Sequence, residues 1–236
     1  MKIFIKIFFI YLLTFTASFA NCLKGDCISG LGTFKNNNYV YVGNFKYGKY
    51  SGQGNLTYAN GRQYIGLFSK GQKSGHGSLT YKSGLKYVGL FFEDEYSGYG
   101  TLTYPDARYY IGNFRKNLFQ GYGVLVYPDG QKYSGDFNEG KFEGYGVVIN
   151  GEGSTLYKGD FESGKYSGYG VLFFNGGKKY TGDFAEGKFS GYGTLSFKDD
   201  LIYIGGFDEG YFDGFGVLNG KEVAHKNGML INNSNW

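Results

Sequence analysis

The chain has 236 residues, of which 43 are Gly, 25 are Tyr, 23 are Phe and only 2 are Pro. Gly-rich chains that lack apolar residues stay disordered, whereas aromatic side chains at this abundance supply a core. The composition therefore excludes a disordered linker and favours strands joined by tight turns. The formal net charge of +4 is nearly balanced, which argues against nucleic acid as a partner.

The first segment of the chain, residues 1–20, has the layout of a secretory signal peptide. A basic region with Lys2 and Lys6 precedes an apolar run, and the small residues Ser18 and Ala20 come just before a cut after Ala20. We therefore expect cleavage there and a secreted, periplasmic or cell-surface protein. An uncleaved anchor stays open as an alternative, although the apolar run is short for a membrane span.

The two cysteines, Cys22 and Cys27, lie directly after the expected cut. An exported protein meets an oxidising compartment, so a Cys22–Cys27 disulfide is favoured over free thiols. A metal pair fits less well, because no other Cys and no nearby His completes a site. A lipid on Cys22 is a further alternative, which the bulky Asn21 before it disfavours.

Beyond residue 40, one sequence unit repeats along the chain. The motif Tyr-x-Gly-x-Phe begins at eight positions: Tyr41, Tyr64, Tyr87, Tyr110, Tyr133, Tyr157, Tyr180 and Tyr203. Of the seven intervals between them, six span 23 residues and one spans 24. Each copy continues with a Gly-containing loop and then Gly-x-Gly-x-Leu-x-Tyr or a close variant. Both halves alternate with period two, which is typical of strands, and Asn60-Gly61 suits a tight hairpin turn. Each unit, numbered one to eight from here on, is therefore predicted to be a β-hairpin.

This pattern resembles the MORN (membrane occupation and recognition nexus) repeat over residues 41–218. The resemblance implies an all-β fold, in which about eight consecutive 23-residue hairpins form an elongated, twisted antiparallel sheet. Residues 21–40 are then an N-terminal cap that contains half a unit, and residues 219–236 are a C-terminal cap or tail. The family also implies scaffolding, self-association and contact with membrane lipid.

The units differ from one another in a few places. Asp94 and Asn117 replace the loop Gly of units three and four, and Ala107 replaces the tight-turn Gly of unit three. Asp and Asn tolerate left-handed backbone, so these two replacements are mild. The single step of 24 residues comes from an insertion within residues 150–156.

Alternation predicts one ring-packed face. In unit five that face should hold these residues: Tyr133, Gly135, Phe137, Phe142, Gly144, Gly146 and Val148. The glycines are expected to make room for rings that lie flat on the backbone. On this interpretation, Gly144→Val displaces a ring and destabilises the array.

The opposite face carries a second column of aromatic residues, which we name the Tyr strip. Its members are Tyr99, Tyr122, Tyr145, Tyr169 and Tyr192. Gln53 and His76 occupy the same position, between the two motif glycines of the second strand, in units one and two. Alternation along the second strands therefore predicts a face that is polar at the start of the rod and apolar in its middle. Either these side chains simply suit strands, or curvature or the tail covers them, or they form a partner-binding strip.

The two halves of the chain differ in charge. Residues 21–120 hold 12 basic and 5 acidic side chains, or +7, whereas residues 121–236 hold 10 and 15, or −5. Opposite ends of the rod would then attract, which favours antiparallel or head-to-tail self-association. The alternative is an ordinary solvated surface.

No catalytic set is recognisable in the sequence. His76 and His225 lack a recognisable nucleophile or carboxylate partner, and no Gly-rich segment has the ending of a phosphate loop. Asp136, Asp160 and Asp183 recur after the motif Gly and could form a carboxylate column for cations, but nearby lysines favour an ordinary charged face. We therefore expect no enzyme activity, no cofactor, no metal and no small-molecule substrate.

The sequence thus predicts an exported, non-catalytic repeat scaffold that binds a protein or a second copy of itself, as in a dimer. The alternative is a module that binds anionic membrane lipid or surface glycan. Such a module would use the Tyr strip or a group of lysines near the loops: Lys46, Lys49, Lys70 and Lys73.

Overall fold

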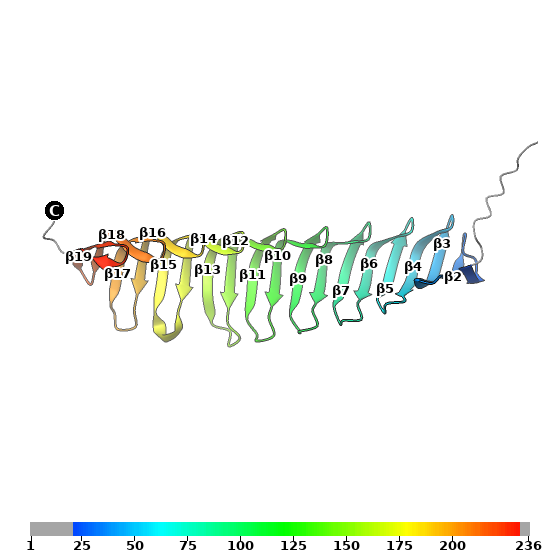
Figure 1. Ribbon diagram of the computed structural model, residues 1–236, viewed down its shortest axis with the longest axis horizontal. Coiled ribbons are helices and arrows are strands. Elements are labelled where there is room, and N and C mark those ends of the chain that lie inside the picture. The colour runs from blue at the N-terminus through cyan, green and yellow to red at the C-terminus, as the bar shows by residue number, and fades with distance from the viewer. Residues whose placement is uncertain (1–20, 232–236) are drawn as a thin grey trace, which may run out of the picture.

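The computed structural model describes residues 21–231, which form one open antiparallel sheet of 20 strands. Consecutive strands pair in chain order along a rod, with the two ends of the described chain far apart (Figure 1). These residues contain no α-helix, and a short 3-10 turn lies at Asn175–Gly177. The all-β prediction is confirmed, whereas the expected signal peptide lies outside the described residues.

The first ten strands are β1 (Cys22–Gly25), β2 (Leu31–Lys35), β3 (Tyr39–Lys46), β4 (Lys49–Tyr58), β5 (Gln63–Ser69), β6 (Gln72–Thr80), β7 (Lys86–Phe92), β8 (Glu95–Thr103), β9 (Tyr109–Arg115) and β10 (Leu118–Val126). The others are β11 (Lys132–Asn138), β12 (Lys141–Ile149), β13 (Thr155–Glu162), β14 (Lys165–Phe173), β15 (Lys179–Ala185), β16 (Lys188–Ser196), β17 (Ile202–Asp208), β18 (Tyr211–Leu218), β19 (Lys221–Lys226) and β20 (Met229–Leu230). Each unit contributes two of them, from β3 and β4 in unit one to β17 and β18 in unit eight.

The first Tyr of every unit folds over a pair of glycines. In unit five, Tyr133 lies over Gly135 and Gly146, which face each other across β11 and β12. A Cβ atom on Gly146 would lie 2.5 Å from Cε2 of Tyr133, so the ring leaves space only for Gly. The Tyr133 hydroxyl donates a hydrogen bond to the carbonyl oxygen of Asp136 (2.8 Å). All eight such tyrosines are only 0–1% exposed, and the burial raises the pKa of the hydroxyls of Tyr41 and Tyr87 to about 12.

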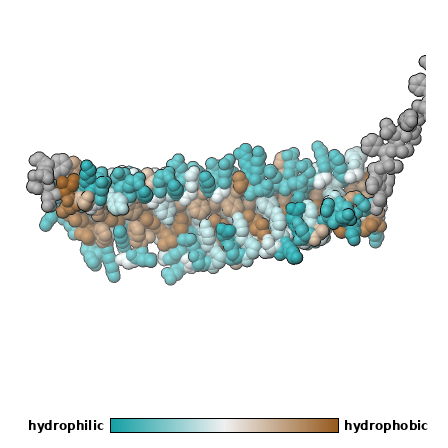
Figure 2. Space-filling model, viewed as in Figure 1, coloured by the Kyte–Doolittle hydropathy of each residue, from teal (hydrophilic) through white to brown (hydrophobic). Residues whose placement is uncertain are grey.

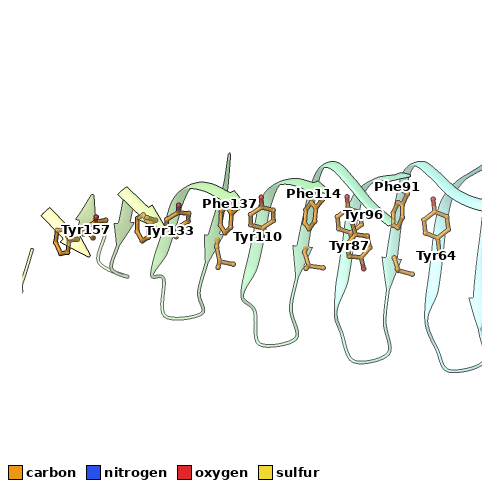
Figure 3. Close-up of a cluster of buried hydrophobic side chains, with 14 of the residues drawn as sticks. Tyr64, Tyr87, Phe91, Tyr96, Tyr110, Phe114, Tyr133, Phe137 and Tyr157 are labelled. Atoms are coloured by element: carbon orange, nitrogen blue, oxygen red, sulfur yellow. The ribbon is translucent and has the colours of Figure 1, made fainter. Parts of the chain in front are cut away.

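Rings from neighbouring hairpins continue this packing into one ladder. Phe142 stacks on Tyr133 at a centroid distance of 3.8 Å, while Phe137 and Phe161 meet its edge at 5.1 and 5.2 Å. Phe161 belongs to unit six, so the contact joins two hairpins that could not bury their apolar faces alone. Figure 3 shows the resulting alternation of Tyr and Phe rings along the rod.

The second strand of each unit contains a β-bulge at its first motif Gly. Gly146 pairs with Gly135, but the next pair along β11 is Asp136 with Glu143, so Gly144 and Tyr145 have no partner on that side. Gly144 has a left-handed φ of 57°, and a Cβ there would face the Asp136 carboxylate at 3.4 Å. The expectation that Gly144 faces the rings is therefore wrong, because alternation breaks at the bulge. Gly144→Val would strain the backbone without displacing a ring.

Departures from the unit are absorbed locally. The extra residue of the 24-residue step is Leu156, which has no partner across β12 and β13. Tyr157 pairs with Val148, and the next pair is Thr155 with Ile149. Asp94, Asn117 and Ala107, which replace Gly, all adopt left-handed φ values of 67–71°.

Both ends of the repeat array are extended by further strands. β2 pairs with β3 in the way that the second strand of a unit pairs with the first strand of the next unit, with Gly32 opposite Gly43. β19 pairs with β18 and places His225 opposite Gly214, where earlier units have Phe. His225 packs edge-on against Tyr203 at 5.7 Å, so this histidine belongs to the core of a cap.

Candidate binding surface

The Tyr strip lies on the face of the sheet opposite the ring ladder. Its five rings are 57–63% exposed, whereas the ladder tyrosines are almost completely buried. The described part of the C-terminal segment does not fold back over them, because β19 and β20 extend the sheet instead. The space-filling view in Figure 2 shows one face of the rod, with a band of hydrophobic residues bordered by hydrophilic ones; tyrosines are not at the hydrophobic end of its scale.

The bulge is what turns each strip residue outward. Tyr145 follows the left-handed Gly144 and precedes Gly146, whose small size admits the Tyr133 ring on the other face. Tyr145 itself pairs with Asp160 on the next strand, β13. A bulge commonly re-aims a side chain in this way. Gly146 thus makes room for the core, Gly144 supplies the left-handed backbone of the bulge, and the residue between them is free to vary.

Each central strip residue lies opposite a carboxylate on the neighbouring strand. The pairs are Tyr122 with Asp136, Tyr145 with Asp160, and Tyr169 with Asp183. The Asp183 carboxylate also accepts a hydrogen bond from the backbone N–H of Tyr192 (3.4 Å). The described residues contain no group of three or more His, Cys, Asp or Glu side chains that could hold one metal ion.

The strip extends into unit eight, beyond the five tyrosines predicted from the sequence. Phe215 occupies the same slot in unit eight and is 68% exposed; the signal for it was the matching Gly-Phe-Gly in the sequence. Together with Tyr192, Val217 and Val223, it lines a hollow of about 360 Å³ at the end of the rod.

The prediction of a polar start to this face holds on the second strands and is wrong on the first strands. Val42, Ile65 and Val88 are exposed there on the first strands of units one to three. Alternation along the second strands cannot reveal these side chains, because they belong to the first strands of the hairpins.

Lys73 is not available for a ligand, contrary to the lysine group proposed from the sequence. It occupies the slot that holds an aromatic ring in the other units, and its side chain is buried against unit three. Its Nζ lies 2.8 Å from the Asp94 carboxylate, which also accepts a hydrogen bond from the Lys73 backbone N–H (3.0 Å). Lys46, Lys49 and Lys70 are exposed near the loops.

The N-terminal cap borders an open hollow of about 410 Å³. The Cys22–Cys27 disulfide, Phe34, Tyr39 and Tyr50 line it. Within residues 21–231, no helix is long and apolar enough to cross a membrane.

Comparisons with known proteins identify the repeated unit. The family model for the MORN repeat matches eight stretches: residues 41–61, 64–86, 87–106, 110–132, 133–155, 157–178, 180–201 and 203–220. No curated protein is significantly similar to the chain.

Among solved structures, the wild-type TCP10 domain of Danio rerio CPAP is 15% identical, with a TM-score of 0.32 over 85% of this chain and 93% of that one. A mutant of the same domain is 14% identical, with a TM-score of 0.34 over 85% and 92%.

Proposed function

The chain belongs to the family of MORN repeat proteins, whose repeats form scaffolds that commonly contact proteins or membranes, and we propose that it is an exported, non-catalytic scaffold that binds a protein partner through the Tyr strip. The observation that carries the proposal is the exposure of this strip on a face that the core does not use. Five rings at this exposure offer about 600 Å² of contact surface, close to the ~800 Å² that one partner supplies in a standard interface.

Export is part of the proposal and has two supports. Residues 1–20 have the layout of a signal peptide. Cys22 and Cys27 are joined by a disulfide next to the expected cut, a bond that persists in oxidising compartments. Sequencing the N-terminus of the protein recovered from its native cells tests this part, because a chain that still begins at Met1 contradicts cleavage.

Capture of partners by strip variants tests the proposed surface. Tyr145→Ser with Tyr169→Ser should lose a cross-linked partner that the wild type retains, because the rings supply most of the contact area. The matched control is Gln53→Ser with His76→Ser, which changes the same slot in units one and two. Retention of the partner by the first variant, with unchanged thermal melting, would refute the role of the strip.

The partner can be a second copy of the chain. The basic half (+7) and the acidic half (−5) complement each other in an antiparallel or head-to-tail pair. Sedimentation at low and high salt tests this form of the proposal: a dimer that dissociates with salt supports it, and a monomer at both salt concentrations contradicts it.

A second candidate function is contact with an anionic membrane at the N-terminal loops. Tyr47 is 82% exposed there, and Lys46 and Lys49 lie on either side of it. Tyr and Lys together suit a membrane interface. Flotation with phosphatidylserine vesicles tests it: Lys46→Ala, Lys49→Ala and Lys70→Ala combined should abolish binding, whereas Lys179→Ala with Lys198→Ala at the acidic end should not.

A further inference from the structure

The acidic part of the Tyr strip is confined to three consecutive units. The first-strand slot that faces the strip holds Asn44, Leu67, Leu90 and Asn113 in units one to four, and Asp136, Asp160 and Asp183 in units five to seven. None of these three carboxylates forms an ion pair with a basic side chain among residues 21–231. The strip there is a row of alternating rings and unpaired negative charges.

Lysines on the same face lie in other rows. Lys158 pairs with Val147 and Val171, and it lies two residues before Asp160 on β13. Lys132 pairs with Val126 and lies four residues before Asp136. Lys179 pairs with Phe173 and lies four residues before Asp183. The row that contains the rings therefore keeps its acidic character.

The spacing of this row is set by the sheet. Neighbouring strands lie about 4.8 Å apart, so a slot that recurs on every second strand recurs about every 9.6 Å. A ligand that contacts successive carboxylates must present its cationic groups at this interval and on one side.

A polyproline II helix meets both conditions. It has three residues per turn and rises about 3.1 Å per residue, so every third side chain points the same way at intervals of about 9.3 Å. A β-strand places every third side chain on alternating sides. An α-helix returns to nearly one side only every seven residues, at about 10.5 Å, so it drifts out of register by about 0.9 Å per unit, against about 0.3 Å for polyproline II. Aromatic-lined surfaces are the usual docking sites for polyproline II segments.

We propose that units five to seven bind a polyproline II segment with Lys or Arg at every third position, laid along the rod across the strands. Its cations meet Asp136, Asp160 and Asp183, and its prolines pack between Tyr122, Tyr145 and Tyr169. The inference rests on the proposed function, because it names the kind of partner that the Tyr strip takes.

Fluorescence anisotropy with labelled peptides tests the proposal on the full chain. One peptide repeats Pro-Pro-Lys, and a second has the same composition with lysines at alternating two- and four-residue intervals. The first should bind about tenfold tighter, because three surface charge pairs form together only in this register. Binding of both peptides with equal affinity would mean attraction by net charge alone and would overturn the proposal.

Variants locate the binding and separate the two proposals. The triple change Asp136→Asn, Asp160→Asn and Asp183→Asn should weaken the first peptide about tenfold, because it removes all three charge pairs. Asp199→Asn, Asp200→Asn and Asp208→Asn remove equal charge elsewhere and should leave it within twofold. Unchanged binding by the first variant overturns the proposal, as does a neutral chito-oligosaccharide that occupies the strip while the peptide does not. A Tyr-dependent partner captured without any peptide binding would leave the scaffold function standing and refute only the polyproline II ligand.

Discussion

The two glycines on either side of Tyr145 should respond differently to the same substitution. Gly146 has no left-handed φ, but the Tyr133 ring occupies the space where its Cβ would be, at 2.5 Å from Cε2 and 2.6 Å from Oη. The ring cannot retreat, because Phe142 stacks on it at 3.8 Å. Gly146→Ala must therefore shift both rings and break the hydrogen bond from the Tyr133 hydroxyl to Asp136.

The expected cost of Gly146→Ala is about 3 kcal/mol. Overpacking a closely packed core costs about 1–3 kcal/mol, and the lost hydrogen bond adds about 1 kcal/mol. For a domain of this size, 1 kcal/mol lowers Tm by about 2–4 °C, so the Tm should fall by about 6–12 °C. Gly144→Ala meets the Asp136 side chain only at ordinary contact distance, and its left-handed backbone should cost about 1–2 kcal/mol.

Circular dichroism during thermal and urea unfolding measures both variants, and hydrogen exchange of unit five detects local opening if the array loses cooperativity. Tyr133→Leu provides the control background, since removal of the ring should make the cost of Gly146→Ala much smaller there. The reasoning is refuted if Gly144→Ala costs more than Gly146→Ala, or if the cost of Gly146→Ala is the same with and without the Tyr133 ring.

Two further predictions concern the core. Lys73→Tyr with Asp94→Gly should raise Tm by a few degrees, because it replaces an ion pair whose lysine is buried with a ring stacked on Tyr64, whereas Lys73→Ala alone should lower it; a lower Tm for the double variant would contradict this. Burial raises the pKa of Tyr41 and Tyr87 to about 12, so the fold favours their neutral form, and this stability is complete below the unfolded pKa of about 10 and lost as the pH rises toward 12. Melting curves should therefore show Tm falling steeply between about pH 10 and 12, and a constant Tm over that range would contradict the burial argument.

The period of the sequence was sufficient to predict the hairpins, because each half of the unit alternates and ends at turn residues. It was also sufficient to predict that glycines admit rings, as Tyr133 over Gly135 and Gly146 demonstrates. Alternation failed at Gly144, because a bulge inserts residues without changing the spacing of the unit. The shifted pairing of Asp136 with Glu143 and the left-handed φ of Gly144 reveal this break in the structure.

Side-chain contacts between units could not be predicted from the sequence for a different reason. Lys73 and Asp94 each depart from the repeated unit, and in the sequence Asp94 is only a mild replacement of a loop Gly. Pairing of adjacent hairpins brings the two side chains together although they are 21 residues apart. Exposure of the Tyr strip likewise depended on the path of the C-terminal segment, which pairs as β19 with β18.

The bulge explains why this fold can carry a variable surface at little cost to its stability. The ring ladder uses the first-strand Tyr, the paired glycines and the following Phe, all of which lie on one face. The slot between the glycines faces the other way and accepts Gln53, His76 or Tyr145 with the same backbone. Since neighbouring units repeat at a fixed interval of about 9.6 Å, side chains placed in this slot form a regularly spaced row. Specificity for a partner can then be set by which units carry a ring and which carry a carboxylate.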